Sequence, residues 1–311
     1  MSEDRPSGHL TDILESAHRE EHELDEDAPL LSLRGVGVSF GGVRALVDVN
    51  FDVQAHRIVA VVGPNGAGKT TLLNAMGGML RKVSGDISLR GTRITGKKPS
   101  QLARAGFGRS FQDPRLIEAE TALENVLSGA HLTMGYGTLD QLIRPWHVRR
   151  QEALARERAM ALLDFVGLGH TRDLTVSSLP YGSRKLIDIA RAMAGSPEIL
   201  MLDEPSSGVD QAERDVIAEV LRELRSGHRM TVVIVEHHMD LVRAVADQVV
   251  GMAAGSAIAV GTPSEVLDSE SFRAAIVGIH GAVAAPTTTA SDQSPGGTGL
   301  AGTASAGRDD G

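Results

Sequence analysis

The sequence contains no cysteine and few aromatic residues, since phenylalanine, tryptophan and tyrosine together make up 3% of its 311 residues. The absence of cysteine excludes a disulfide scaffold and a cysteine-ligated metal site, and it is typical of a reducing compartment. No apolar run approaches the roughly 20 residues that a membrane-spanning helix needs. The acidic N-terminus also lacks the basic and then apolar order of a signal peptide. We therefore expect a cytoplasmic protein that reaches a membrane only through a partner.

The net charge of −9 is concentrated at the two ends of the chain. Residues 1–28 carry ten acidic side chains against two arginines, and residues 284–311 consist largely of Ala, Thr, Ser and Gly. Both compositions predict flexible tails, although apolar spacing near the N-terminus also allows a short helix. The stretch between the tails, residues 29–283, is nearly neutral and gives no indication of nucleic-acid binding.

Strand and helix patterns alternate along residues 29–283. Alternating apolar residues at 31–40 and 47–53 predict antiparallel strands. Short continuous apolar runs at 57–63, 198–205 and 230–238 predict buried parallel strands. Helical patterns occupy 70–80, 185–194 and 211–225, and also most of 121–166, with an interruption at 131–150. The pattern predicts an α/β fold: a parallel-sheet core, an antiparallel β subdomain and a helical subdomain at about 113–195.

A phosphate-binding loop follows the first buried strand and opens a helix, which is the context that the motif G-x-x-x-x-G-K-[ST] requires. Its glycines allow the backbone to wrap around phosphates, and the helix N-terminus adds positive potential. We expect Lys69 to reach the β- and γ-phosphates of ATP and the Thr70 hydroxyl to ligate Mg²⁺. The predicted loop comprises Gly63, Pro64, Asn65, Gly66, Ala67, Gly68, Lys69, Thr70 and Thr71.

Two acidic residues end the second buried strand, in the segment ILMLDEP. Ligands of open α/β sheets bind at this carboxyl edge. We expect Asp203 to hold Mg²⁺ through water and Glu204 to orient or deprotonate the attacking water. The alternative is that the strand simply ends in a polar turn before Pro205.

The segment just before this strand resembles the signature of the ABC ATPase family. Leu179, Pro180, Tyr181, Gly182 and Ser183 stand where the family has Leu-Ser-Gly-Gly-Gln. In the family this segment crosses a dimer interface to the γ-phosphate that the other subunit holds. Here proline replaces the serine and serine replaces the glutamine. These departures leave two alternatives: a weaker contact in trans, or an ordinary variant of the signature that works fully.

The resemblance implies four further site residues. Gln112 corresponds to the Q-loop glutamine, which touches Mg²⁺ or the attacking water, and His237 corresponds to the switch histidine that bonds the γ-phosphate. Asp210 corresponds to an acid at the dimer interface, but it could equally cap the next helix. Phe40 corresponds to the aromatic that stacks on adenine, and a core position is its alternative. For His238 we expect an ordinary exposed position.

Finer similarities point to the ATPase subunits of branched-chain amino-acid uptake systems and their amide and urea relatives. They lie in the segments 109–126, 179–182, 234–242 and 261–267. The resemblance implies permease partners on the inner face of the cell membrane and a second ATPase subunit, in a heterodimer or possibly a homodimer. It also implies an extracytoplasmic substrate-binding protein that acts indirectly. An exporter of the lipopolysaccharide type is an alternative. A soluble ABC ATPase is disfavoured by the single phosphate loop and by the lack of sustained heptads between Lys69 and Leu179.

Overall fold

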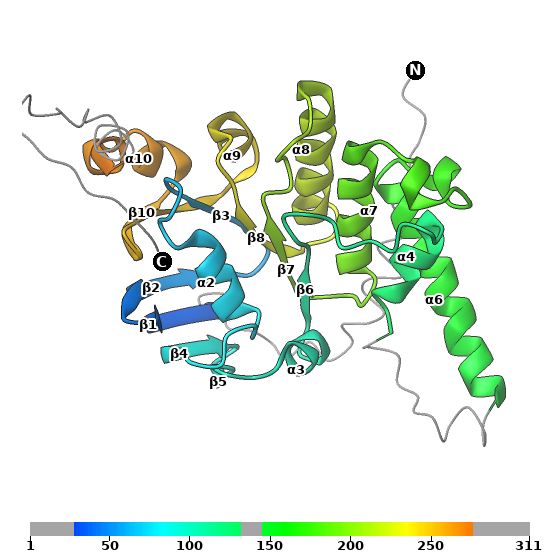
Figure 1. Cartoon of the computed structure of the whole chain (residues 1–311), viewed down its shortest axis with the longest axis horizontal. Helices are drawn as coiled ribbons and strands as arrows, with labels where there is room; N and C mark the ends of the chain where they lie inside the picture. The colour runs from blue at the N-terminus through cyan, green and yellow to red at the C-terminus, as the bar shows by residue number, and fades with distance from the viewer. Residues whose placement is uncertain (1–27, 132–144, 276–311) are drawn as a thin grey trace, which may run out of the picture.

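The computed structural model describes residues 28–131 and 145–275 (Figure 1). The predicted tails fall almost wholly outside these ranges, as does most of the predicted interruption at 131–150. The strands are β1 (Leu31–Phe40), β2 (Val43–Val53), β3 (Ile58–Val62), β4 (Ser84–Leu89), β5 (Thr92–Arg93), β6 (Phe107–Arg109), β7 (Ile199–Asp203), β8 (Thr231–Val235), β9 (Gln248–Ala253) and β10 (Ser256–Gly261). The α-helices are α2 (Lys69–Met76), α3 (Pro99–Arg104), α4 (Ala122–Ser128), α6 (Pro145–Phe165), α7 (Tyr181–Met193), α8 (Gln211–Ser226), α9 (Met239–Val245) and α10 (Pro263–Leu267).

These strands form two sheets. One is antiparallel with the order β2-β1-β4-β5, and the other has the order β10-β9-β3-β8-β7-β6. In the second sheet the pairs from β9 to β6 are all parallel, and only β10 runs antiparallel to its neighbour. The α/β fold class predicted from the sequence is therefore confirmed.

The central strands of the larger sheet are buried on both faces. In β3, Val59 and Val61 join a core shared with α2 and the antiparallel sheet. Ile58, Ala60 and Val62 join a second core with helices of the opposite face. Burial on both faces explains why β3, β7 and β8 appear in the sequence as continuous apolar runs rather than as alternating patterns. It also leaves the strand ends as the places where polar groups can lie.

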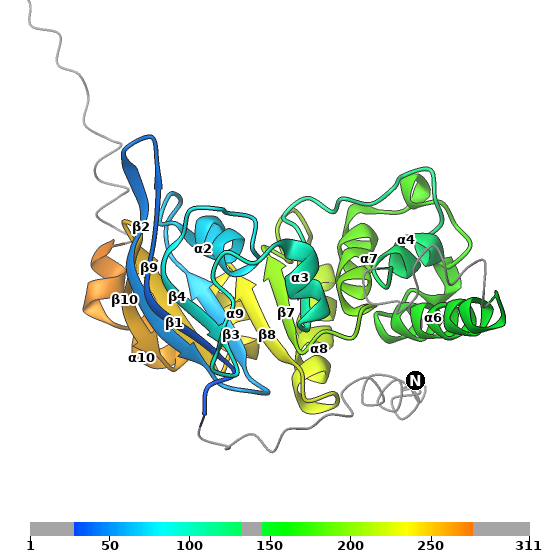
Figure 2. The ribbon, with the colours of Figure 1, turned by 90° about the horizontal axis from the view of Figure 1, so that it is seen from below.

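The helices fall into groups that both views show clearly (Figures 1 and 2). Helix α2 lies between the two sheets, α8 and α9 cover the other face of the larger sheet, and α4, α6 and α7 lie together beyond its β6 edge. Several predicted boundaries need correction. Strand β2 begins at Val43 rather than at residue 47, and α2 ends at Met76 rather than at residue 80. Helix α6 begins at Pro145, inside the predicted interruption, and α7 begins at Tyr181 rather than at residue 185. Proline fits the first turn of a helix, since its missing N–H has no partner there anyway.

Across residues 28–131 and 145–275, no helix combines the length and the apolar character that crossing a bilayer requires.

The turn from β3 into α2 depends on Gly63. Its φ is +152°, and a Cβ placed on it would lie 2.2 Å from the carbonyl oxygen of Met252. Gly66 has a φ of +81°, but a Cβ there would meet no atom within 4 Å. A substitution at Gly63 would therefore cause both backbone strain and a steric clash, whereas a substitution at Gly66 would cause only backbone strain.

We predict that Gly63→Ala lowers the free energy of unfolding by more than about 1 kcal/mol, because it adds a backbone clash to an unfavourable φ. Gly66→Ala should cost less, since it adds only the strain. Urea unfolding of both variants without nucleotide measures the difference. Equal losses in the two variants would contradict this account of the turn.

Candidate active site

Strand order brings four segments from distant parts of the sequence to one edge of the larger sheet. The neighbours β3, β8, β7 and β6 are parallel, so their carboxyl ends meet at the same edge. The phosphate loop follows β3, Glu236 and His237 follow β8, Asp203 ends β7 with Glu204 next, and Gln112 lies three residues after β6. This edge is where open α/β sheets bind ligands.

Lys69 is buried at the first position of α2. Its Nζ donates hydrogen bonds to the carbonyl oxygens of Gly63 at 2.8 Å and Pro64 at 3.1 Å, so it closes the phosphate loop. Burial lowers the pKa of Lys69, an effect that the carboxylates of Glu204 and Asp203 oppose. Thr70 lies exposed in the same first helical turn. Pro64, Asn65, Gly66, Ala67, Gly68 and Thr71 complete the loop as predicted between β3 and α2.

Asp203 is buried at the last position of β7, and its Oδ1 has no hydrogen-bond partner. The other oxygen, Oδ2, lies 3.7 Å from an Nη of Arg109, whose second contact is a 2.7 Å hydrogen bond to Asn74 Oδ1. Burial raises the pKa of Asp203, and the Arg109 guanidinium opposes that rise. A buried carboxylate oxygen without a hydrogen-bond partner fits a site for a hard cation such as Mg²⁺. It lies at the same edge as the phosphate loop, on β7, which β8 separates from β3.

Glu204 lies at the centre of the arrangement. Its φ of +48° is in the left-handed region, which is uncommon for a non-glycine residue and recurs at active sites as well as in turns. Its Oε2 accepts a 3.0 Å hydrogen bond from Gln112 Nε2 and lies 3.9 Å from Nδ1 of His237. The three residues implied separately by the sequence are thus neighbours, although they come from the ends of three different strands.

Lys185 connects two of these segments from α7. Its Nζ is a donor to the carbonyl oxygen of Gln112 and to that of Glu204, the latter at 3.2 Å. The side chain is buried, which lowers its pKa, and Asp188 one turn later opposes that shift most strongly. A buried lysine therefore fixes the backbone of both the Gln112 loop and the Glu204 loop.

The signature-like segment forms the start of α7. Leu179 is buried, Pro180 is the N-cap, and Tyr181, Gly182 and Ser183 form the first helical turn. Tyr181 is 41% exposed, and both views place α7 apart from α2 (Figures 1 and 2). The structure therefore does not bring this segment to the phosphate loop of the same chain.

Asp210 and Phe40 lie at the ends of other elements. Asp210 is the exposed N-cap of α8 and accepts a 2.9 Å hydrogen bond from the backbone N–H of Glu213. Within a single chain, Asp210 therefore caps the helix, which is the alternative stated for it above. Phe40 ends β1 and is 52% exposed. The alternative that Phe40 is a core residue is therefore wrong, and its ring face is accessible for stacking.

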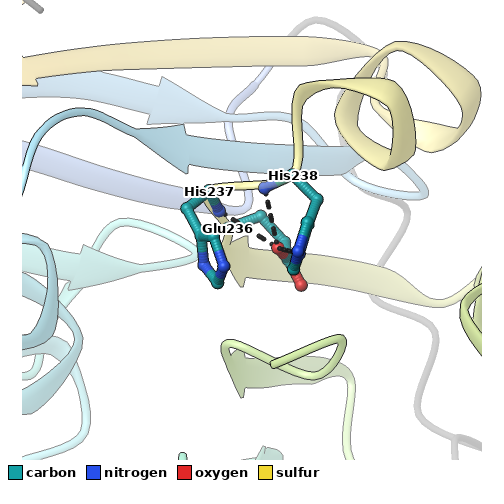
Figure 3. Close-up of side chains that lie close together, drawn as sticks. All are labelled: Glu236, His237 and His238. Carbon is teal, nitrogen blue, oxygen red and sulfur yellow. Dashed lines mark hydrogen bonds and ion pairs between the residues drawn. The ribbon is translucent and has the colours of Figure 1, made fainter. Parts of the chain in front are cut away.

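The loop after β8 groups Glu236, His237 and His238 (Figure 3). Ligand atoms of the three lie within 4.8 Å of one another, but both Glu236 oxygens already accept backbone N–H hydrogen bonds. The expectation that His238 is an ordinary exposed residue is wrong. It is half-buried, and its Nδ1 lies 2.7 Å from Ser206 Oγ.

A comparison with known protein families identifies the chain. The family model described as "ABC transporter" matches residues 46–207. The chain belongs to the ABC transporter family. It is therefore an ATP-binding cassette, of the kind whose ATP hydrolysis powers transport.

Relatives and a solved structure agree with the family assignment. The chain is 36% identical over 250 residues to the high-affinity branched-chain amino acid transport ATP-binding protein LivG of Escherichia coli, an alignment that covers 80% of this chain and 98% of LivG. It is 37% identical over 250 residues, with the same coverage, to the corresponding protein BraF of Pseudomonas aeruginosa. The ADP conformation of an ATP-binding cassette of an ABC transporter matches with a TM-score of 0.69 and 30% identity, over 81% of this chain and 98% of that one.

Sequence reasoning missed several residues of this cassette: Arg109, Lys185, Ser206 and Glu236. Lys185 shows a usable signal, because it is a cation on the apolar face of an amphipathic helix. Glu236 also shows one, because it is an acid at the end of a continuous apolar run. Nothing local to Arg109 or Ser206 indicates a partner, since their contacts come from other strands.

We predict that Lys185→Met lowers both stability and the rate of ATP hydrolysis. Each buried carbonyl that loses its donor costs about 1–3 kcal/mol, and the Glu204 and Gln112 loops lose their shared anchor. Chemical unfolding and steady-state ATPase assays measure the two effects. Lys82→Met, at an exposed lysine, is the matched control and should change neither. Normal turnover in Lys185→Met would show that this anchor does not support the site.

Proposed function

We propose that this chain is the ATP-hydrolysing subunit of an importer for branched-chain amino acids or related small amides. The similarity to LivG and BraF, which are branched-chain amino acid transport ATP-binding proteins, supports this substrate class and favours it over a lipopolysaccharide-type exporter or a soluble ATPase. The observation that carries the catalytic part is the position of Glu204, 3.0 Å from Gln112 and 3.9 Å from His237 at the edge that holds the phosphate loop.

In the proposed mechanism the chain's own groups bind and orient the reactants. Lys69 and the N–H groups of the phosphate loop hold the β- and γ-phosphates of ATP. Glu204 accepts the proton of the attacking water or orients it, while Gln112 holds the Glu204 carboxylate. His237 contacts the γ-phosphate, which an imidazole can do as a donor. Phe40 stacks on the adenine ring.

The residues present fit Mg²⁺. Asp203 offers a buried carboxylate oxygen without a hydrogen-bond partner, and Thr70 offers a hydroxyl in the first turn of α2. Gln112 supplies an amide oxygen at the same edge of the sheet. Together they would hold the cation, whose chemistry is to neutralise phosphate charge.

The proposed assembly contains two ATPase subunits and membrane permeases. Within the segment Leu179–Ser183, which lies apart from α2 of its own chain, Pro180 and Tyr181 are exposed, and they and the exposed Asp210 could contact a second subunit. We expect that subunit to be a different ATPase chain, with a homodimer as the alternative. Permeases would hold the pair at the inner face of the membrane, and a substrate-binding protein outside would deliver the substrate. Residues 29–283 form the proposed ABC domain, with 113–195 as its helical subdomain.

The catalytic proposal predicts that Glu204→Gln keeps ATP binding but slows hydrolysis by about 10²–10⁴-fold, the usual contribution of a general base. Lys69→Ala should instead weaken nucleotide binding, since it removes the phosphate contact. Binding of a fluorescent ATP analogue and phosphate release separate the two effects. Near-normal turnover in Glu204→Gln would remove this residue from the role of base.

The assembly proposal predicts that ATP drives association. The Glu204→Gln variant binds ATP without consuming it, so it should form a dimer on addition of Mg-ATP, either alone or with its partner chain. Light scattering with and without nucleotide measures the mass. A stable dimer whose mass is independent of ATP would contradict the proposal.

A further inference from the structure

Glu236 carries a fully buried carboxylate directly after β8. Its Oε1 accepts a 3.0 Å hydrogen bond from the backbone N–H of Ser206, and its Oε2 accepts bonds from the N–H groups of His237 at 3.0 Å and His238 at 3.3 Å. Figure 3 shows both histidine rings arranged around this carboxylate. Burying a carboxylate is costly unless hydrogen bonds satisfy it, and here three backbone donors do so.

These three donors belong to two different catalytic loops. Ser206 lies two residues after Glu204, on the loop that follows β7. His237 and His238 lie on the loop that follows β8. One carboxylate therefore holds together the two chain segments whose side chains, Glu204 and His237, approach to 3.9 Å.

A second link joins the same loops. His238 Nδ1 lies 2.7 Å from Ser206 Oγ, and His238 Nε2 lies 3.5 Å from an Nη of Arg214 on α8. The hydrogen bond between the His238 ring and the Ser206 hydroxyl therefore joins the two loops, and Nδ1 also lies 3.4 Å from Glu236 Oε2. The contact with Arg214 connects the loops to α8.

We propose that Glu236, together with the His238–Ser206 link, is a positioning device that fixes His237 relative to Glu204. It does not touch substrate. It acts by holding the backbone from which the two catalytic side chains extend. This inference rests on the roles proposed above for Glu204 and His237.

Glu236→Gln is the direct test. A glutamine amide offers one acceptor and one NH₂ donor to three backbone N–H groups, so at least one of them loses its partner. We expect kcat for ATP hydrolysis by the full-length chain to fall roughly ten- to a hundredfold, since small displacements of reacting groups have effects of this size. The KM and the affinity for a fluorescent ATP analogue should be unchanged, because the phosphate loop and Lys69 are not involved.

Asp247→Asn is the matched control. This carboxylate also accepts a backbone N–H, that of Ile58 at 2.9 Å, but at the start of β3, the opposite end of the strand from the site. The control should lose stability and keep its kcat. An equal loss of kcat in both variants at equal loss of thermal stability would overturn the proposal, because it would reduce the effect to general destabilisation.

If Glu236→Gln does not fold, variants that remove the His238–Ser206 hydrogen bond test the proposal instead. Ser206→Ala and His238→Ala each remove the same hydrogen bond, so each should lower kcat at constant KM, and the double variant should be no worse than the more affected single variant. Unchanged kcat in both single variants, or fully additive losses, would overturn the proposal.

The catalytic role proposed for Glu204 and the positioning role proposed for Glu236 would be contradicted by different results. Normal turnover in Glu204→Gln would defeat the proposed catalytic site itself. An inactive Glu204→Gln variant combined with a normal kcat in Glu236→Gln would leave the site intact and defeat only the positioning role.

Discussion

Burial of the parallel sheet on both faces is the constraint from which the rest of this structure follows. The side chains of β3, β7 and β8 lie in two apolar cores, one on each side, so these strands have no solvated face for polar groups. The acidic and histidine side chains of these segments, Asp203, Glu204, Glu236 and His237, follow the apolar residues, at the carboxyl edge. Parallel pairing then puts all of these strand ends side by side. The site is thus a product of topology: residues as distant in sequence as Lys69 and His237 meet because their strands are neighbours.

Charged side chains at a partly buried edge of the sheet lose part of their hydration, which is unfavourable. The fold compensates by placing groups of opposite charge, or hydrogen-bond donors, beside them. Burial lowers the pKa of Lys69, and the carboxylates of Glu204 and Asp203 oppose that effect. Burial also lowers the pKa of Lys185, and there Asp188 opposes it most strongly, with a smaller contribution from Glu204. Glu236 is instead satisfied by backbone N–H groups, which carry no net charge. The result is a site in which an exposed side chain, that of His237, extends from a backbone held by a buried acid.

The sequence predicts the features of this arrangement that depend on neighbouring residues, but not the contacts between distant segments. Continuous apolar runs predict β3, β7 and β8, and the glycine spacing around Lys69 predicts the turn into α2. These features depend on neighbouring residues, so a local pattern records them. The hydrogen bond between Ser206 and His238 joins two loops, and Arg109 on β6 contacts Asn74 on α2 and Asp203 on β7. No spacing within one segment encodes these contacts. The start of α7 was misplaced for a related reason: Tyr181 and Gly182 favour a turn by composition, yet they form the first turn of a long amphipathic helix.

The N-terminus of α7 shows what the replacement by Pro180 does and does not remove. The first hydrogen bond of the helix runs from the N–H of Arg184 to the carbonyl of Pro180, so the N–H groups of Tyr181, Gly182 and Ser183 precede the helical ladder. A proline at the N-cap removes one further N–H and the serine hydroxyl, but it leaves these three groups and the helix dipole in place. The close neighbour of this helix end is a carboxylate: a Cβ on Gly182 would lie 2.1 Å from Glu213 Oε1. Glu213 also caps α8 with Asp210, so its charge is fixed beside the positive end of α7. A phosphate that reached this helix end from a second subunit would share it with Glu213. The strength of the proposed contact in trans would therefore depend on Glu213 as well as on the residue at position 180.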